Sequence, residues 1–526
     1  MKERNTMKTT RRRFLAYTGA GGLGLLAAAC TPAAPTAPAA STAPAASAKP
    51  AARVPAGEIK VAVPVKVPTL DPHGAQSVED VSHTVLQHVM ETLVRRDAAS
   101  GNLVPGLATE WKNPDPTMWS FTLRTDARFH DGSKVTSADV KGSLERVIAL
   151  KGALAPQFAQ VDSIATPDGS TVQIKTKTPV GTLLANMAMV PIAPAAQVNA
   201  EGFFKKPIGS GPFKVLSWSA DADLRLEANL DYWGGPPGVK TLVFRYYPEV
   251  APLVTALETG EIDFTWRLPP DQLPGLQRNA QIKVDSVPGW TYYFLWMNSS
   301  RQPFTDKRVR QAMAYALDVD KMLKDLLGAS AKRATAPIPS TVFGHAPQTP
   351  YNYDPSKAKQ LLAQAGLPNG FDAGVIWNPG SAPQDRELLQ AMISYWNAIG
   401  VRVKSQEMER AVWIDNLNKL NWDMDLQANA VTTGDADFTL GRLYHSRANR
   451  NGYKNPDLDK FLDDAVATVD QDRRKALYAQ ANKTIWDDAV GIFPAELFNV
   501  FAYRKRVTGF VPTATAITSF ANLTVQ

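Results

Sequence analysis

The sequence has little of what builds the reactive centres of most enzymes. It holds one cysteine, Cys30, and six histidines in 526 residues. A sole cysteine cannot form an internal disulfide, so the fold depends on a buried core, which a chain of this length can build. HExxH, CxxC, G-x-S-x-G and GKS/T patterns are missing, so nothing in the sequence indicates a metalloprotease, a zinc finger, a serine hydrolase or a P-loop enzyme.

Long apolar runs and charge of a single sign are also missing. The one extended apolar stretch, from Phe14 to Leu26, is too short and too rich in glycine for a membrane-spanning helix. The net charge is +7, but residues 1–29 carry six basic side chains and one acidic, which leaves 51 basic and 49 acidic elsewhere. The rest of the chain is nearly neutral and lacks the excess of basic residues that binding to a phosphate backbone requires, so we do not expect nucleic acid as a partner.

The N-terminal segment has the composition of an export signal over residues 1–30. Thr10 to Leu15, "TRRRFL", resembles the twin-arginine motif, and "AAAC" ending at Cys30 resembles a lipoprotein cleavage box. We expect Cys30 to carry a lipid, the alternative being an ordinary cleaved signal that contains a cysteine. Residues 31–55 consist mainly of Ala, Pro, Ser and Thr and predict a disordered tether that holds the body near a membrane surface.

The body shows alternating helix and strand signals, which predict an α/β architecture. Residues 59–63 and 119–123 have the patterns of strands. Thr136 and Asp139 form a capping box before an amphipathic helix.

Further helices are predicted downstream. One is capped by Thr305, one runs from Asp354 to Gly366, and one covers residues 389–399 and ends at Gly400.

The stretch "RFHDG" places His130 beside Asp131 at a glycine. The pair lies where a strand must turn toward the capped helix, and Asp and Gly are turn residues by their chemistry. We interpret it as a turn, with a catalytic pair as the alternative. His83 and His88 lie five residues apart, a poor chelate on a helix, so we expect no metal site and no cofactor.

Ten segments of the body follow one another in a recognisable order. They are 69–73 (TLDPH), 91–97 (ETLVRRD), 103–111 (LVPGLATEW), 121–140 (FTLRTDARFHDGSKVTSADV), 207–215 (PIGSGPFKV), 229–235 (NLDYWGG), 256–264 (ALETGEIDF), 303–318 (PFTDKRVRQAMAYALD), 455–465 (NPDLDKFLDDA) and 503–510 (YRKRVTGF). With these segments the chain resembles the extracytoplasmic solute-binding proteins of ABC importers, in the peptide/nickel-binding family, family 5.

The resemblance implies a two-lobed α/β fold, the periplasmic-binding-protein type II fold in its large three-subdomain variant, with the ligand cleft between the lobes. The expected boundaries are 56–86 with 206–300 and 500–526 for the central subdomain of lobe 1, 87–205 for its outer subdomain, and 301–499 for lobe 2. Two crossing segments near Asn298 and Phe498 would form the hinge.

The implied function is that of a lipid-anchored receptor in the periplasm or on the outer face of the cell membrane. It would be a monomer and no enzyme, closing on a small solute and delivering it to ABC permease subunits. Two alternatives stay open, a secreted hydrolase on the same scaffold and a peptide-binding chaperone or receptor without transport.

The ligand is less defined. Peptide binders of this family carry a Trp-x-x-Asp-Tyr element whose aspartate holds the α-amine of the peptide, because a buried ammonium needs a carboxylate. Registered on "LYHS" (443–446), the tryptophan falls near Asn429, the anchor near Thr432, and Asp435 matches a second aspartate; after a slip of a few residues, Asp435 or Asp437 would be the anchor. Oligopeptides, dipeptides, opines, oligosaccharides and metal chelates therefore all remain candidate ligands.

Aromatic residues give a second set of candidates. Trp290, Tyr292, Tyr293 and Trp296 cluster before the expected hinge, and Trp377 and Trp413 follow in the second lobe; the last four, Tyr293, Trp296, Trp377 and Trp413, are taken as candidate ligand contacts. Because strand residues alternate between faces, only one face of this cluster can meet the ligand, and we favour Tyr293 or Trp296 over the whole cluster, with core packing as the alternative.

Overall fold

A computed structural model describes residues 54–74, 76–219, 223–515 and 517–526, so Cys30 and the predicted signal lie outside the described residues. Helices and strands alternate through these ranges, which confirms the predicted α/β class. The strand predicted at 59–63 is β1 (Glu58–Val63), and the one predicted at 119–123 is β5 (Met118–Leu123).

The largest sheet of the described residues has eleven strands, in the order β15-β14-β16-β12-β17-β11-β1-β10-β9-β8, with β13 paired to β17. Besides β1, its strands are β8 (Phe213–Ser217), β9 (Leu224–Ala228), β10 (Thr241–Tyr246), β11 (Phe264–Trp266), β12 (Ile282–Met297), β13 (Ala331–Arg333), β14 (Asp372–Trp377), β15 (Arg402–Glu407), β16 (Met424–Ala430) and β17 (Gly491–Arg504). The pairs of β1 with β10 and β11, and of β14 with β15 and β16, are parallel, and the other pairs are antiparallel.

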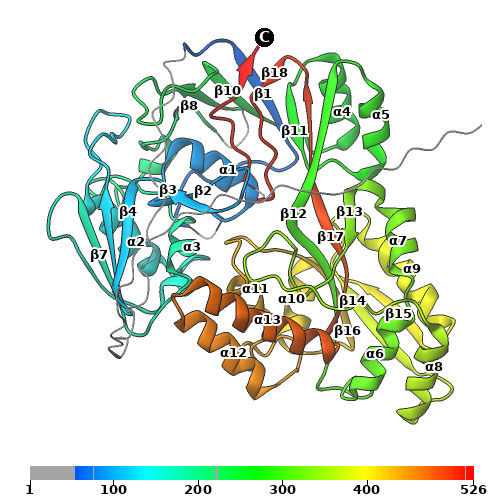
Figure 1. The fold of residues 1–526 in the computed structure, drawn as a ribbon. Helices are drawn as coiled ribbons and strands as arrows, with labels where there is room; N and C mark the ends of the chain where they lie inside the picture. The colour runs from blue at the N-terminus through cyan, green and yellow to red at the C-terminus, as the bar shows by residue number, and fades with distance from the viewer. Residues whose placement is uncertain (1–53, 75, 220–222, 516) are drawn as a thin grey trace, which may run out of the picture. The chain divides into compact units, whose positions relative to one another are not determined.

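The two long strands β12 and β17 run side by side through the middle of this sheet (Figure 1). Their pairing shifts register between Pro288 and Tyr292, where proline cannot donate to the ladder. Beyond this shift the side chains of β12 alternate between two cores, with Tyr293 on one side and Tyr292 on the other. Both faces of β12 are therefore covered.

Helices cover the two faces of the β14–β16 part of the sheet. On the Tyr293 side, apolar residues of α6 to α9 form one core, and on the Tyr292 side α11 to α13 form another. These helices are α6 (Lys307–Tyr315), α7 (Val319–Leu326), α8 (Pro355–Gln364), α9 (Asp385–Asn397), α11 (Asp437–Tyr444), α12 (Pro456–Ala467) and α13 (Gln471–Asp487), and α10 (Arg410–Asn418) precedes β16.

A four-stranded antiparallel sheet, β4-β5-β7-β6, forms a separate core with α2 (Ser137–Leu150) and α3 (Leu183–Met187). Its further strands are β4 (Ala108–Asp115), β6 (Val161–Ala165) and β7 (Thr171–Thr176). The capping box before α2 is confirmed, since the Asp139 carboxylate accepts from the backbone N–H and the hydroxyl of Thr136, both at 2.8 Å.

The remaining elements surround β1. Helix α1 (Asp80–Val89) packs with β1 and β8–β10, and α4 (Val250–Thr259) and α5 (Leu273–Arg278) pack around Ala62. Short pairs are formed by β2 (Val94–Arg96) with β3 (Leu103–Pro105) and by β18 (Val507–Thr508) with β19 (Thr524–Val525). Single turns of 3-10 helix cover Ala155–Phe158, Phe203–Lys205, Pro270–Gln272, Gly328–Ser330 and Ser446–Ala448.

Helix termini follow the predicted signals with one correction. Asp354 caps α8, accepting from Lys357 N at 2.8 Å, and Gly366 beyond its end has a φ of +81°. The cap of α6 is Asp306, which accepts from Arg308 N at 2.8 Å, so the prediction of Thr305 was wrong by one residue. An aspartate oxygen reaches the first-turn N–H groups as well as a threonine hydroxyl does, and the sequence offered both.

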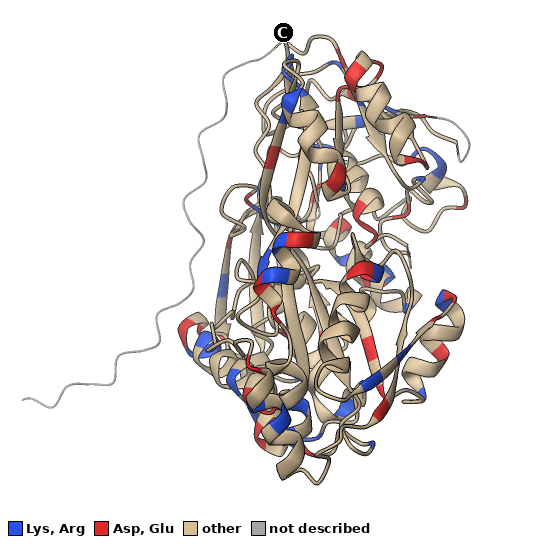
Figure 2. Ribbon diagram, turned by 90° about the vertical axis from the view of Figure 1, so that its right-hand side faces the viewer, with Lys and Arg blue, Asp and Glu red and all other residues tan. Residues whose placement is uncertain are grey.

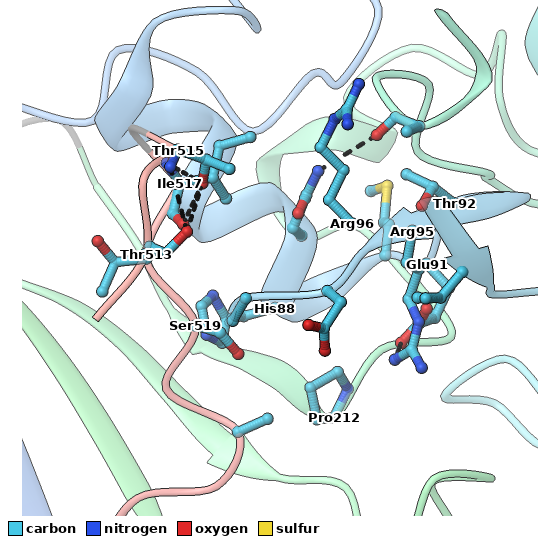
Figure 3. A pocket seen from close by; sticks show the side chains of 18 of the residues that line it. His88, Glu91, Thr92, Arg95, Arg96, Pro212, Thr513, Thr515, Ile517 and Ser519 are labelled. Atoms are coloured by element: carbon cyan, nitrogen blue, oxygen red, sulfur yellow. Dashed lines mark hydrogen bonds and ion pairs between the residues drawn. The ribbon is translucent and has the colours of Figure 1, made fainter. Parts of the chain in front are cut away.

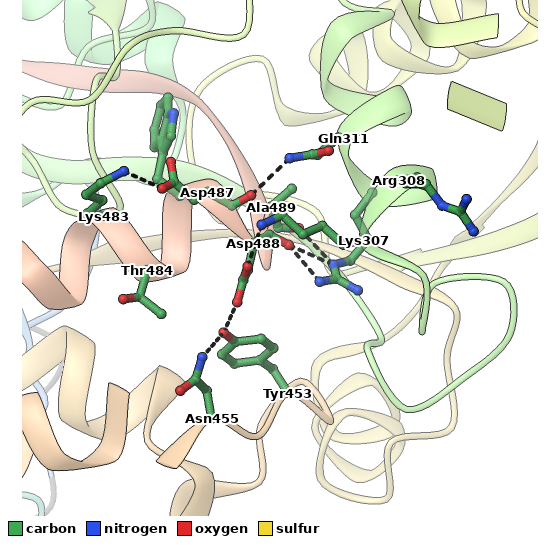
Figure 4. A network of polar contacts seen from close by, with 12 residues as sticks. Lys307, Arg308, Gln311, Tyr453, Asn455, Lys483, Thr484, Asp487, Asp488 and Ala489 are labelled. Carbon is green, nitrogen blue, oxygen red and sulfur yellow. Dashed lines mark hydrogen bonds and ion pairs between the residues drawn. The ribbon is translucent and has the colours of Figure 1, made fainter. Parts of the chain in front are cut away.

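A polar network fixes the C-terminal end of α13 against α6 and the start of α12 (Figure 4). Asp488 accepts from Lys307 Nζ at 2.8 Å and from the hydroxyl of Tyr453, which in turn accepts from Asn455, the cap of α12, at 2.9 Å. Gln311 donates to the Asp487 carbonyl at 3.1 Å. Charges of both signs are interspersed along the ribbon in Figure 2, as the nearly neutral body predicted.

Candidate functional site

Stretches that are far apart in the sequence line a cavity of about 260 Å³. Strand β2 and the turn before it contribute Glu91, Arg95 and Arg96, the loop after β16 contributes Thr432, and residues 513–522 contribute Thr518. In Figure 3 the C-terminal segment with Thr513 to Ser519 faces the labelled side chains of residues 88–96. Only the tertiary fold brings these segments together.

Glu91 is 4% exposed, and its two carboxylate oxygens differ. Oε1 accepts the hydroxyl of Tyr232 and lies 3.9 Å from Arg95 Nη1, whereas Oε2 has no hydrogen-bond partner among the described residues. Burial raises the pKa of Glu91, and Arg95 and Tyr232 offset part of that rise. A buried acceptor without a partner costs about 1–3 kcal/mol, so this atom points to a ligand donor.

Arg96 is the neighbouring cation. It donates from Nη1 to the Gly101 carbonyl at 2.8 Å and from Nη2 to the Thr433 carbonyl, and its guanidinium lies 5.1 Å from the centre of the Trp290 ring. Its Nε is buried without a partner in the described chain. Burial lowers the pKa of Arg96 to about 10, although nearby Asp435 opposes that shift, so the guanidinium stays charged at neutral pH.

The C-terminal segment supplies the third unpartnered group, the Thr518 hydroxyl, in a fully buried side chain. His88 holds this segment, since its Nε2 accepts from Phe520 N at 2.7 Å while Nδ1 lies 2.6 Å from the Thr84 carbonyl. Burial lowers the pKa of His88 to about 4, which keeps the ring neutral and able to accept. The lining of the cavity thus includes a carboxyl, a guanidinium and a hydroxyl group, each with a buried atom that has no hydrogen-bond partner among the described residues.

The three predicted anchor positions, Thr432, Asp435 and Asp437, are divided between two cavities. Thr432 lines the first cavity, while Asp435 and Asp437 line a second cavity of about 380 Å³. Both Asp435 oxygens accept from Arg474 Nη2 at 2.9 Å, so Asp435 already has a cation. Burial, with the charge of Asp435, raises the pKa of Asp437 to about 6.

The four predicted aromatic contacts lie outside the linings of both cavities. Tyr293 is fully buried and donates to the Pro383 carbonyl at 2.7 Å, and Trp296 is 1% exposed and donates to the Tyr444 hydroxyl at 3.2 Å.

Trp377 is 2% exposed and donates to Ser405 Oγ at 2.9 Å, and half-buried Trp413 donates to Asp425 at 2.8 Å. These contacts place Tyr293, Trp296 and Trp377 in hydrophobic cores. Core packing was the stated alternative to ligand contact for Tyr293 and Trp296. A role of these residues in ligand binding stays a prediction.

The histidine of "RFHDG" is held by a distant glycine segment, and the aspartate is held within the turn itself. His130 Nδ1 accepts from Gly209 N at 3.1 Å, and its Nε2 lies 3.1 Å from the Gly211 carbonyl. Asp131 accepts from Ser133 N and Oγ at 3.0 and 2.6 Å. Among the described residues, no three metal-binding side chains gather as an ion would need.

Glu91, Arg95, Arg96 and Thr518 were not predicted from the sequence. The sequence did carry a signal for the first three residues, because in "ETLVRRD" charged residues flank a short apolar pair. Burying a charged group costs free energy unless a partner compensates it, so such residues are candidates for binding. Thr518 had none, since an isolated threonine near a C-terminus is unremarkable in a sequence.

The mixed α/β architecture is that of periplasmic binding proteins. The peptide-binding protein DppA of Helicobacter pylori, solved in complex with the peptide STSA, superimposes with a TM-score of 0.76 at 26% identity, over 89% of this chain and 98% of that one. The model of the bacterial extracellular solute-binding proteins, family 5, matches residues 102–451. The chain belongs to this family, as its resemblance had implied.

Two relatives cover most of the sequence. The glutathione-binding protein GsiB of Pectobacterium atrosepticum is 29% identical over 88% of this chain and 93% of its own length. The probable D,D-dipeptide-binding periplasmic protein DdpA of Escherichia coli is 30% identical over 84% and 89%. Within the described ranges, no helix combines the length and apolarity needed to cross a bilayer.

Proposed function

We propose that the protein is the receptor of an ABC importer, capturing a small solute in the cavity of Glu91, Arg96 and Thr518 and delivering it to permease subunits. The observation that carries the proposal is that three residues in the lining of one cavity, Glu91, Arg96 and Thr518, each hold a buried polar atom without a hydrogen-bond partner among the described residues. A solute with donors and acceptors would satisfy all three, and no bond needs to be made or broken.

The solute is a short peptide or a peptide-like molecule. An ammonium or amide N–H suits Glu91, and a carboxylate or carbonyl suits Arg96. The relatives bind glutathione or peptides by their names, which supports this class. Opines, oligosaccharides and metal chelates are the competing classes in the binding test below.

Capture works by closing two lobes, with boundaries as expected from the sequence. The lining supports this, because Glu91 comes from residues 87–205, Thr432 from 301–499 and Thr518 from 500–526. A solute bound to all three favours the closed state by its differential affinity, and the permease recognises that state.

The receptor acts outside the cytoplasm, as a monomer held by a lipid on Cys30. The tether of residues 31–55 gives it reach in the periplasm or on the outer face of the membrane. Cys30 lies outside the described residues, so this part of the proposal rests on the sequence.

The test combines mass spectrometry of co-purified solute with titration calorimetry of glutathione, D-alanyl-D-alanine, the peptide STSA, an opine, an oligosaccharide and a nickel chelate. Glu91→Gln should weaken the bound solute at least tenfold, since hydrogen bonds to charged groups contribute about 1.5–3 kcal/mol. Glu145→Gln, at an exposed position of α2, is the matched control. Equal affinities in the wild type and Glu91→Gln would remove the cavity from the proposal.

The two alternatives predict other outcomes. A hydrolase would turn over a candidate solute, and His130 would then matter, although both of its ring nitrogens face backbone groups. A chaperone would bind loosely and leave uptake intact after gene deletion, whereas a receptor would show one tight ligand class and lost uptake.

A further inference from the structure

The second cavity, of about 380 Å³, carries an electrostatic imbalance. Helix α11 and the turn after it contribute Arg442, Arg447 and Arg450, and two facing segments contribute Gln157 and, around α3, Thr182 and Asn186. The facing side chains are uncharged, so the charge balance is decided by the arginines and by Asp435 and Asp437.

Arg442 and Arg450 have no carboxylate partner in the part of the chain that the structure describes. Arg442 donates to Asn429 Oδ1 at 2.8 Å and to the Phe438 carbonyl at 3.2 Å, and Arg450 donates to Asn418 Oδ1 at 2.7 Å. All three acceptors are neutral amide oxygens. Arg447, in contrast, is paired with Asp463 at 2.8 Å.

The two aspartates of the lining balance at most one of these two cations, because only Asp437 is free of an ion pair within the described residues. Asp435 is paired with Arg474, which lies outside the lining. Burial and Asp435 raise the pKa of Asp437 to about 6, although Arg474 and Arg447 oppose that shift. Burial lowers the pKa of Arg442, Tyr292 opposes that shift, and the charge of Arg450 adds to it, so the two cations repel each other.

We propose that this cavity binds a small oxyanion, a carboxylate or a phosphate group, between Arg442 and Arg450. A guanidinium presents its N–H groups in a planar fork that matches both anions, and one anion would relieve the repulsion between two cations. The amide and hydroxyl groups of Gln157, Thr182 and Asn186 border the same space and suit the remaining oxygens. A free anion at this site would go beyond the proposed function, whereas a carboxylate of the captured solute would rest on it.

The anion has two possible sources, a free ion or the carboxylate of the captured solute. Thr432 lines the first cavity and Thr433 the second, so a solute could extend from one to the other. Both sources share the chemistry, and the experiment separates them.

The experiment titrates inorganic phosphate, succinate, D-alanyl-D-alanine and its C-terminal amide into the full chain at constant ionic strength, with calorimetry and thermal shift as readouts. The variants are Arg442→Gln/Arg450→Gln and the control Arg473→Gln, which removes a charge from an exposed position of α13. Arg450→Lys keeps the charge without the fork and guards against misfolding of the double variant.

We expect saturable binding that weakens at least tenfold in the double variant, less in Arg450→Lys, and not in Arg473→Gln. Binding of free phosphate or succinate identifies a free anion. A loss restricted to the dipeptide, and absent for its amide, identifies the solute carboxylate. The site is overturned if every probe binds the folded double variant and folded Arg450→Lys with the same affinity as the wild type. The first cavity is tested by Glu91→Gln, so failure of one proposal leaves the other standing.

Discussion

Arg96 on β2 donates a hydrogen bond to the carbonyl of Thr433, 337 residues further along the chain. The same guanidinium lies over the Trp290 ring and bonds the Gly101 carbonyl. One side chain therefore ties the segment before β3 to the loop after β16, at the boundary between the two cavities.

Arg96→Gln should weaken solute binding at least tenfold and lower the melting temperature. The substitution removes the donors to Thr433 and Gly101 and the charged Nε in the cavity, and hydrogen bonds of charged groups contribute about 1.5–3 kcal/mol. Calorimetry and thermal denaturation measure the two effects. Arg128→Gln, which loses only a bond to Gly132 in an exposed turn, is the control, and an affinity equal to it would contradict the prediction.

Gly181→Ala should separate the segment around Gly181 from residues 466–468. Gly181 N donates to the Val466 carbonyl at 2.7 Å, and a Cβ on Gly181 would lie 1.9 Å from the Thr468 carbonyl oxygen, so the two segments could not approach. In the proposed lobe motion this contact joins residues 87–205 to 301–499, and small-angle scattering should show a larger radius of gyration. Gly169→Ala, where a Cβ meets nothing within 4 Å, should leave scattering unchanged.

Asp425→Asn should stabilise the protein at pH 8. Asp425 is fully buried on β16 and bonded by Trp413 and Gln427, and burial raises its pKa from 3.8 to about 7. The folded state therefore keeps the proton that the unfolded state loses above pH 3.8, so stability falls as pH rises from about 4 to about 7. Three pKa units correspond to a loss on the order of 4 kcal/mol.

Asparagine removes this loss, so the melting temperature of Asp425→Asn should exceed that of the wild type at pH 8 and match it near pH 4. Asp415→Asn, exposed on α10, is the control for a change of charge alone. If the melting temperatures of the wild type and Asp425→Asn changed with pH in the same way across this range, the buried carboxylate would not be the source of the stability loss.

Thr432→Asp should strengthen binding of dipeptides with a free α-amine, because the new carboxylate would line the first cavity. The N-acetylated dipeptide is the matched ligand and should gain nothing. Unchanged dipeptide affinity would count against the register that places the anchor at Thr432.

Cys30→Ser should release the protein from membranes. A lipid on Cys30 would be its membrane anchor, so the variant should appear in the soluble fraction after fractionation, while the wild type withstands a high-salt wash. A variant that stays bound after that wash would refute lipidation.

Local signals in the sequence predicted local structure well. The capping box of Thr136 and Asp139, the start of α8 at Asp354 and strand β1 are confirmed, because each depends on neighbouring residues. The cap of α6 was misplaced from Asp306 to Thr305, since two adjacent residues could both cap it. For Tyr293 and Trp296 the sequence left ligand contact and core packing as two interpretations, because their burial depends on helices that pack on both faces of β12.

By itself the sequence determined the α/β class and the order of the elements, because periodicity, caps and turn residues act over a few positions. The family followed from the resemblance of its ten ordered segments. Only the tertiary structure decided which polar groups meet. Glu91, Arg96 and Thr518 are more than 400 residues apart at the extremes, and the pairing of Asp435 with Arg474 spans 39 residues. Such contacts depend on where the strands cross and the helices pack, which no short stretch of sequence encodes.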